Sequence, residues 1–520
     1  MNSGAGVGGY SKSMLEMITD RLNYQSPLTL ESGVTARHEV VLHPNCNARD
    51  WVSGPMEFYA PADRSMFTDS HSFKLHGKVG MEVLDNSTNK WISLHQKIED
   101  LKEEQQKQQD EQQQNEQQQN ETETEEDDDQ QEEQIGNKRP PPSSSTQSTA
   151  KRLKRDLDLN LLGPSVGVVN NFFSSLISSL EVKLNDAKIG DGSTGSYAYM
   201  AYVQKLLGIP TNQSGSEILK TQMFIKDPPG GMKTPLIAEE TGYSTRRGML
   251  ASGHWIDFHE PLYSDLTTCE KYLPPDVKLS FTFRRTSEDF AVWQSKGSQD
   301  KCRIVLKDIY MTVDRLEVKD VHLKNWQNIV KAGKPVEIRF TESVLKTFAI
   351  PKGTRELSHH NLYMTDQLPD KVYAFIVEQD AYNGHREKNP YYFEYPELSE
   401  VHLNVNGINE PNPGYRMDEE ERYSAFLLFL ANTGTNHFET ESVNISYKDY
   451  MDGTFIAAFD RSPTRDNGLY TNPPQSGSMS ISMRTSKKTK DNYVVLTIAS
   501  FERLLVIDGD RVSIKPLYNK

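Results

Sequence analysis

Residues 277–285 read VKLSFTFRR, and every second residue from Val277 to Phe283 is apolar. A period of two indicates a β-strand with one face in a core and the other in solvent. The same alternation recurs in PVEIRFTE (335–342), EVHLNVNG (400–407) and GSMSISMRT (477–485). Because many short strands are expected and few helices, the pattern predicts a mainly β chain built as a sandwich or a barrel.

The expected elements occur twice in the same order. In the first half, the strand SLEVKLND (179–186) leads through a Gly-rich loop into a helical stretch over 196–208. In the second half, the strand EVHLNVNG leads through a loop with Pro411 into a helical stretch over 420–434. The repeat lies in the pattern and not in the identity of the residues. We therefore expect two similar β domains of about 200 residues each.

A polar insertion at residues 97–160 interrupts the first of these domains. Residues 99–134 contain 16 Asp or Glu and 2 Lys, so they carry almost all of the chain's net charge of −15. Low hydrophobicity and like charge predict disorder over the insertion, with a frayed helix at the start of the run. Since the rest of the chain is close to neutral, we expect no broad basic face for sequence-specific binding of nucleic acid.

Two basic clusters with a Pro/Ser spacer follow the acidic run. The six residues are Lys138, Arg139, Lys151, Arg152, Lys154 and Arg155. Their arrangement resembles a bipartite nuclear-import signal. The alternative interpretation is a basic counterweight to the acidic run, or a loose contact with nucleic acid.

Motifs for catalysis or cofactor binding are not evident in the sequence. It has no P-loop, no GxGxxG motif after a strand and no HExxH motif. The cysteines Cys46, Cys269 and Cys302 form neither a disulfide framework nor a metal-binding spacing. We therefore predict that the protein is not an enzyme and that it has no catalytic, cofactor-binding or metal-binding residues. No apolar run approaches the roughly 20 residues of a membrane-spanning helix, so no membrane span is expected.

One group comes near a metal-ligand pattern. His254, Asp257 and His259 carry the imidazole and carboxylate groups that bind zinc. The adjoining Trp255 and Phe258 belong to a strand-like stretch. A structural role for the three polar residues is therefore the preferred interpretation.

Two apolar features invite a choice between binding and packing. The aromatic residues Tyr391, Tyr392, Phe393 and Tyr395 suit either a ligand platform or a packed anchor at a domain or subunit interface. We prefer the packed anchor. The amphipathic stretch from Tyr423 to Leu430 is interpreted as a helix covering one end of a sandwich rather than a membrane binder.

Several stretches together resemble a known family. They are VGVVNNFFSSLISSLEVKLNDAKI (166–189), YAYMAYVQKLL (197–207), KTQMFIKD (220–227), residues 259–285, residues 368–407 and IASFERLLVIDGDRV (498–512). The most specific motif comprises Asp380, Ala381, Tyr382, Asn383, Gly384, Asn389, Pro390 and Phe393. In these stretches the chain resembles the major capsid proteins of Polinton/Maverick elements and adintoviruses. The resemblance covers roughly residues 50–96 and 161–515, whereas the insertion and the N-terminal region lie outside it.

The resemblance implies two eight-stranded jelly rolls in tandem, with short helices in their loops. The expected division is an N-terminal arm over 1–49, a first jelly roll over 50–325 and a second over 326–520. It further implies a structural capsid subunit that forms pseudo-hexagonal homotrimers. Such trimers tile an icosahedral shell around double-stranded DNA, with other capsid proteins such as a penton as partners. The expected location is the virion, with assembly in the host nucleus.

Two other functions remain open from the residues alone, because a fold does not fix a function. One is a cellular jelly-roll module that binds carbohydrate or protein. The other is a domesticated capsid protein that a host retains for a role of its own.

Overall fold

The structure is a computed structural model of the chain. It describes residues 33–48, 51, 54–85, 88–104, 106–108, 110, 166–213, 215–235, 241–269, 271–298, 300–360, 362–363, 367–433, 443–462, 473–509 and 511–516.

Two antiparallel sheets and a short strand pair form the first domain. One sheet has the order β1-β12-β4-β9, with β3 on β12 and β5 on β4, and the other has the order β2-β10-β7-β8. Strands β6 and β11 pair separately. The strand bounds are β1 Val34–Leu42, β2 Met56–Ala60, β3 Met66–Thr68, β4 Lys74–Asp85, β5 Lys90–Ser93, β6 Val166–Val168, β7 Ile177–Leu184, β8 Ala187–Ile189, β9 Ile256–Pro261, β10 Leu279–Arg285, β11 Val292–Gln294 and β12 Cys302–Val318.

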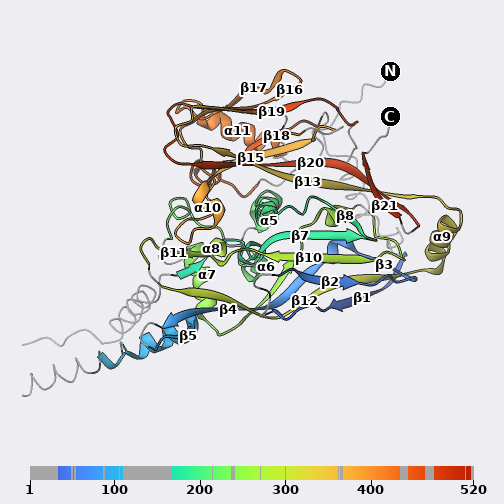
Figure 1. Ribbon diagram of the computed structural model, residues 1–520, viewed down its shortest axis with the longest axis horizontal. Helices are drawn as coiled ribbons and strands as arrows, with labels where there is room; N and C mark the ends of the chain where they lie inside the picture. The colour runs from blue at the N-terminus through green and yellow to red at the C-terminus, as the bar shows by residue number, and fades with distance from the viewer. Residues whose placement is uncertain are drawn as a thin grey trace, which may run out of the picture.

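Two further antiparallel sheets form the second domain, which is stacked on the first (Figure 1). One has the order β13-β20-β15-β18 with β21 on β20, and the other has the order β14-β19-β16-β17. The bounds are β13 Val336–Ile350, β14 Glu356–His359, β15 Lys371–Glu378, β16 Leu398–Val405, β17 Ile408–Arg416, β18 Ala457–Asp460, β19 Met479–Thr485, β20 Tyr493–Asp508 and β21 Arg511–Pro516.

The two domains share one topology. In each domain, eight strands numbered along the chain form one sheet in the order 1-8-3-6 and a second sheet in the order 2-7-4-5. The first domain supplies β1, β2, β4, β7, β8, β9, β10 and β12 to this scheme, and the second supplies β13 to β20 in sequence. Two eight-stranded jelly rolls in tandem are therefore confirmed, with a few short strands added at the edges.

Alternation of apolar and polar residues produces the sandwich cores. Leu279, Phe281 and Phe283 of β10 are buried, as the period of two predicts. Across the sandwich the Phe281 ring meets Phe73 edge-on, with centroids 5.1 Å apart. Strand β19 in the second domain repeats this burial pattern. One face of each strand thus builds a core while the other stays polar.

The helices lie mostly in the connections between strands. Their bounds are α4 Phe172–Ser175, α5 Ser196–Gly208, α6 Glu217–Thr221, α7 Gly242–Ala251, α8 Glu288–Ala291, α9 Asp320–Lys331, α10 Gln379–Asn383, α11 Arg422–Asn432 and α12 Tyr447–Met451. The 3₁₀ turns are η2 Ser70–Ser72, η3 Thr211–Gln213 and η4 Asp265–Thr268. Helices α5 and α11 each follow the fifth strand of their domain, so the predicted repeat of strand and helix is confirmed.

One expected loop is in fact a strand. The segment around Pro411 forms β17, which pairs with β16. Its two prolines suggested a loop because proline removes a backbone donor. Since β17 is the edge strand of its sheet, the missing donors need no partner there.

Both ends of the first domain differ from the expected division. Residues Val34–Leu42, assigned above to an N-terminal arm, form β1 and pair with the C-terminal half of β12. This part of the expected arm therefore belongs to the first sheet. The expected boundary between residues 325 and 326 falls inside α9, which connects β12 to β13.

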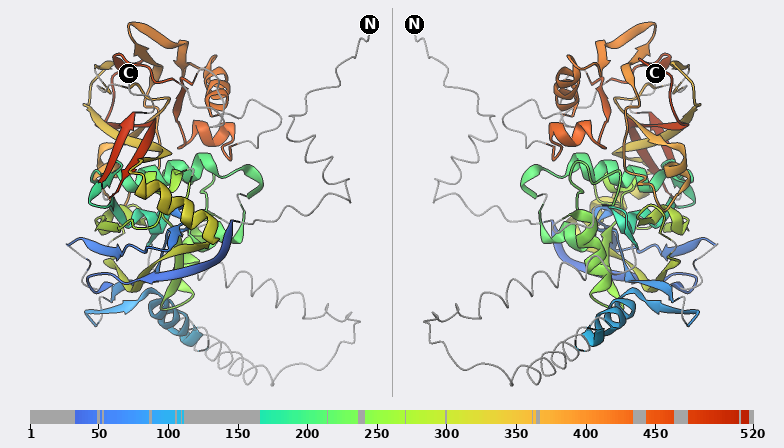
Figure 2. Two further views of the ribbon diagram at one scale, coloured as in Figure 1. Left: turned by 90° about the vertical axis from the view of Figure 1, so that its right-hand side faces the viewer. Right: turned by 90° about the vertical axis from the view of Figure 1, so that its left-hand side faces the viewer.

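The start of the polar insertion is helical. Residues 94–104 form a helix that leaves the first domain on the side away from the second domain (Figure 2). The frayed helix expected at the start of the acidic run is thus present. Residues 106–108 and 110 are also helical, and the remainder of the insertion, including all six basic residues of the expected import signal, lies outside the described residues.

Candidate functional site: the seam between the two domains

The family-like motif lies where the two domains meet, and we call this contact the seam. Helix α10 directly follows β15. This helix and the segment after it contact α5, α8 and β11 of the first domain. Ala381, Asn389, Pro390 and Phe393 of the motif are buried there. The seam is therefore built largely from the stretch that the sequence marked as most specific.

Aromatic rings from both domains interleave at the seam. The Tyr391 ring stacks on Tyr202 of α5 with centroids 4.1 Å apart and planes inclined by 17°. Phe393 meets the same Tyr202 edge-on at 5.7 Å, and Tyr199 of α5 stacks on Tyr382 at 5.9 Å. Tyr391, Tyr202 and Phe393 are fully or almost fully buried. The packed anchor predicted for this run is thus confirmed at Tyr391 and Phe393, and it lies at a domain interface.

Hydrogen bonds fix the position of this aromatic cluster. The Tyr391 hydroxyl lies 2.6 Å from the Ser175 hydroxyl of α4. The amide of Asn389 donates to the backbone carbonyl of Met232 at 3.0 Å, while its oxygen accepts from the Tyr391 amide at 3.0 Å. Burial raises the pKa of Tyr391 above its ordinary value, so the hydroxyl stays protonated. These directional hydrogen bonds therefore fix the position of the Tyr391 segment against the first domain, which apolar packing alone would not do.

Close backbone approach explains the glycine of the motif. Gly384 has a φ of +88°, a conformation that other residues adopt only with strain. A Cβ atom at this position would lie 3.1 Å from the backbone nitrogen of Phe290 in the first domain. Two contacts hold the segment around Gly384. The Asp380 carboxylate forms an ion pair with Lys388 at 2.9 Å, and the backbone carbonyl of Arg386 accepts a hydrogen bond from the backbone N–H of Gln294 at 2.7 Å.

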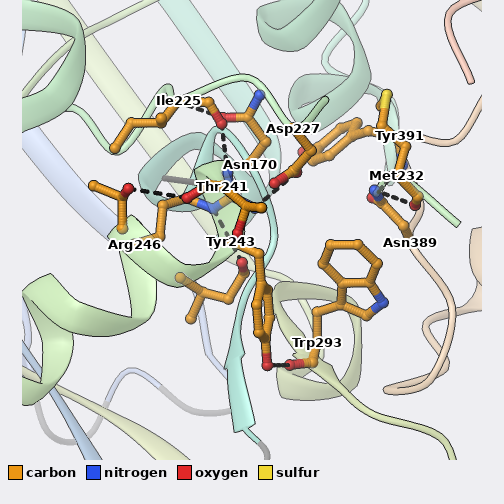
Figure 3. Close-up of polar contacts among 12 residues, drawn as sticks. Asn170, Ile225, Asp227, Met232, Thr241, Tyr243, Arg246, Trp293, Asn389 and Tyr391 are labelled. Atoms are coloured by element: carbon orange, nitrogen blue, oxygen red, sulfur yellow. Dashed lines mark hydrogen bonds and ion pairs between the residues drawn. The ribbon is translucent and has the colours of Figure 1, made fainter. Parts of the chain in front are cut away.

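A buried ion pair supports the seam from the first domain (Figure 3). Arg246 of α7 donates to the carboxylate of Asp227 at 2.8 Å, and the two side chains are 0% and 1% exposed. The remaining guanidinium donors reach the backbone carbonyls of Val168, at 3.2 Å, and Ile225. Because every part of the guanidinium is engaged, the charge is compensated in the interior.

Arg246 holds together segments that are distant in sequence. Val168 ends β6, whose partner β11 bears Trp293, and the Trp293 carbonyl accepts from the Tyr243 hydroxyl at 3.2 Å (Figure 3). Trp293 is followed by Gln294, which binds the motif segment. The ion pair thus positions the surface of the first domain on which the second domain rests.

The metal-like residues of the sequence do not converge. Asp257 faces Lys78 at 3.8 Å, and His259 Nδ1 lies 2.5 Å from Nδ1 of His76 on the neighbouring strand. His254 instead meets the Trp255 ring edge-on. Within the described part of the chain, no group of three or more His, Cys, Asp or Glu residues is arranged to hold a metal ion. Among the same residues, no helix is long and apolar enough to cross a membrane.

Sequence reasoning missed the ion pair and the contribution of α4. Asp227 precedes Pro228 and looked like part of a turn, and Arg246 sits in the polar stretch STRRG. Neither position carries a sequence signal for burial, because arginine and aspartate are usually exposed. The aromatic residues of the seam, by contrast, were predicted from the sequence to form a packed anchor.

Comparisons with known proteins agree with this architecture. No protein-family model matches the chain. An uncharacterized protein of Caenorhabditis elegans is 22% identical over 347 residues, which cover 65% of this chain and 79% of the relative.

Solved structures show the same arrangement at low sequence identity. The Sputnik virophage structure matches with a TM-score of 0.56 and 11% identity, covering 100% of this chain and 95% of that chain. The mavirus major capsid protein matches with a TM-score of 0.50 and 8% identity, covering 100% and 97%. The Faustovirus major capsid protein matches with a TM-score of 0.51 and 9% identity, covering 94% of each chain. The chain thus has the double jelly-roll fold found in major capsid proteins of viruses.

Proposed function

We propose that this chain is a structural capsid subunit that assembles into pseudo-hexagonal homotrimers. The observation that carries the proposal is the pair of jelly rolls with identical strand order, held in one register by a buried seam. Three such chains contribute six similar domains, which gives a threefold oligomer a nearly sixfold outline. Many trimers with this outline pack side by side into an icosahedral shell of the kind that encloses double-stranded DNA.

The proposed role is non-enzymatic and depends on contact between copies. Each subunit in a closed ring presents one surface to one neighbour and a different surface to the next. Obligate interfaces of this kind bury more than about 2,000 Å². The strand-connecting loops are the natural source of these contacts, since the sandwich cores hold the frame. Placement among Polinton/Maverick or adintovirus capsid proteins, a penton partner and a virion location follow from the resemblance and are part of the proposal.

The oligomeric state tests this proposal directly. Size-exclusion chromatography with light scattering is expected to give three times the chain mass of 59.1 kDa. Negative-stain images of that peak are expected to show particles with a hexagonal outline. A protein that stays monomeric at high concentration would contradict the proposal and favour a cellular binding module, which would also need a saturable ligand.

A domesticated capsid protein is the second candidate function. The nematode relative favours it, since that relative comes from an animal and matches 65% of this chain. The flanking genes distinguish the two candidates. A packaging ATPase, a protein-primed DNA polymerase or a capsid protease beside the gene favours an active element, and their absence favours a host role.

The expected import signal gives a separate prediction. A reporter fused to residues 136–156 is expected to enter nuclei, because the fused stretch carries both basic clusters. Changing Lys151, Arg152, Lys154 and Arg155 to alanine should return the reporter to the cytoplasm. Fluorescence microscopy measures the nuclear share, and a parent fusion that remains cytoplasmic disproves the import role.

A further inference from the structure

A lysine and a glutamate are buried together beside the seam. Nζ of Lys205 in α5 lies 2.6 Å from Oε1 of Glu260 in β9, and each side chain is only 1% exposed. The Ser174 hydroxyl of α4 donates to the same oxygen at 2.5 Å. Removing a charged lysine and a charged glutamate from water costs free energy, so the burial of this pair suggests that it has a chemical role.

The side-chain amide of a buried asparagine completes the group. Oδ1 of Asn171 accepts a hydrogen bond from Lys205 Nζ at 3.0 Å, and Asn171 is 0% exposed. Because a carbonyl bond is about 1.2 Å long, Nζ lies within about 4.2 Å of the amide carbon. The Asn171 backbone has a φ of +55° and precedes α4, where the Ser175 hydroxyl donates to its carbonyl at 2.8 Å.

Two polar atoms of this group have unused capacity. Among the described residues, Oε2 of Glu260 is buried without a hydrogen-bond partner, and Nδ2 of Asn171 is buried with the Tyr391 hydroxyl as its one weak partner. Buried polar atoms in proteins are normally paired, and exceptions call for an explanation. If the amide reacted, Nδ2 of Asn171 would take up a proton and leave, and the Glu260 carboxylate, whose Oε1 contacts Lys205 Nζ, would carry that proton.

Burial makes the ammonium form of Lys205 easier to deprotonate, while the neighbouring carboxylate and two aromatic rings stabilise that form. The Lys205 ammonium nitrogen lies 5.7 Å from the ring centre of Phe224 and 5.2 Å from that of Tyr263. Burial lowers the pKa of Lys205 below its ordinary value, even though Glu260 opposes the shift. A neutral amine is a nucleophile, whereas an ammonium group is not.

We infer that Lys205 and Asn171 form an intramolecular isopeptide bond, with Glu260 as the group that transfers protons. Glu260 first takes a proton from the ammonium group, which frees the electron pair on Nζ. Nζ then attacks the amide carbon, and a tetrahedral intermediate forms with the negative charge on the former amide oxygen. Glu260 returns the proton to Nδ2, and the carbon–nitrogen bond of the old amide breaks as the carbonyl re-forms. Glu260 then takes the remaining extra proton from Nζ and passes it to the departing ammonia, which leaves as an ammonium ion.

The step balances without any further reactant. One alkylammonium group and one primary amide become one secondary amide and one ammonium ion, so charge and protons balance and no atom is oxidised or reduced. Glu260 ends in its starting protonation state, and the bond forms once in each chain. The reaction is therefore a self-modification and not an activity with turnover.

The bond would join α5 to the residue that starts α4. Tyr202 and Ser175, which belong to these two helices, both contact Tyr391 of the second domain. A covalent link between the helices would therefore hold both surfaces of the first domain on which the second domain rests. This inference does not depend on the shell-building proposal, since it concerns a single chain.

Intact-mass spectrometry of the denatured full-length protein tests the inference. The expected mass is lower than the sequence mass by one molecule of ammonia. After protease digestion, the peptides containing Lys205 and Asn171 are expected as one branched species. A full-length protein at its unmodified sequence mass, with both peptides linear, would overturn the inference.

A lysine elsewhere in the chain serves as the control in the same digest. Lys226 also binds a carboxylate, that of Asp449 at 2.7 Å, but its other partner is the backbone carbonyl of Asn444 and not a side-chain amide. Its peptide is expected to be linear. A branched peptide at Lys226 would mean that cross-linking is nonspecific and would also count against the inference.

The variant Glu260→Gln removes the proton carrier and keeps a side chain of similar shape. It is expected to show the full sequence mass with both peptides linear. Loss of a mass difference that the wild type shows supports the role of Glu260, and an unchanged mass deficit refutes it. Because the bond can form only where the fold brings Lys205 and Asn171 together, circular dichroism must first show that the variant folds like the wild type.

Discussion

Replacing Arg246 with alanine is expected to lower the free energy of unfolding by about 3–5 kcal/mol. The substitution leaves the Asp227 carboxylate buried without its cation and leaves the carbonyls of Val168 and Ile225 without their donor. A domain is stable by only about 5–15 kcal/mol, so a large share of the protein should be unfolded or aggregated. Denaturant unfolding followed by circular dichroism measures the loss.

Two matched variants sharpen this prediction. Arg484→Ala removes an exposed arginine, 63% accessible, whose partner Glu356 lies 3.4 Å away, and it should cost less than about 1 kcal/mol. The double variant Arg246→Met with Asp227→Leu removes both charges and should be more stable than Arg246→Ala, because no lone charge stays buried. Equal losses for Arg246→Ala and Arg484→Ala would show that the buried pair does not support the first domain.

Replacing Tyr391 with alanine is the second large effect, with an expected loss of about 3–5 kcal/mol. The buried ring packs against α5, α4 and α8 of the first domain, so its removal leaves a cavity and breaks the stack on Tyr202. Tyr391 connects the hydrophobic cluster of the second domain to helices of the first domain, so the loss falls mainly on the contact between the domains. We therefore expect the two jelly rolls to separate before either one unfolds.

Limited proteolysis followed by size-exclusion chromatography detects whether the two domains separate. Every residue of α9 is at least partly exposed, so cleavage there gives one fragment for each domain. Fragments of the nicked wild type are expected to elute together from a sizing column, and those of Tyr391→Ala apart. The conservative variant Tyr391→Phe keeps the ring and loses the contacts of the hydroxyl with Ser175 and Asn171, at a cost of about 1–2 kcal/mol, and its fragments should stay together. Separation of the wild-type fragments would show that the seam does not hold the domains.

Local sequence patterns predicted much of the architecture. The period of two over Leu279–Phe283 and Met479–Met483 placed these strands and their buried faces, because alternation follows directly from backbone geometry. The repeated order of strand and helix predicted two similar domains. The aromatic run at Tyr391 predicted a packed anchor because large rings are rarely left in water.

Contacts between distant residues escaped prediction for a physical reason. Burial of Arg246, Asp227, Lys205 and Glu260 depends on which segments fold over them, and those segments are far away in the chain. The strand β17 was taken for a loop because its prolines suit both an edge strand and a turn. His254, Asp257 and His259 are likewise near one another in the sequence but do not form a common site, because His259 contacts His76 on the neighbouring strand instead.

The sequence alone determined that this chain is mainly β and duplicated, because alternation and turn residues act over a few neighbouring positions. Tertiary structure alone decided how strands order themselves in the sheets, which charges are buried and how Lys205 meets Asn171. These features arise from contacts between residues separated by long stretches of chain, and a pattern of near neighbours does not encode which distant partner each residue meets.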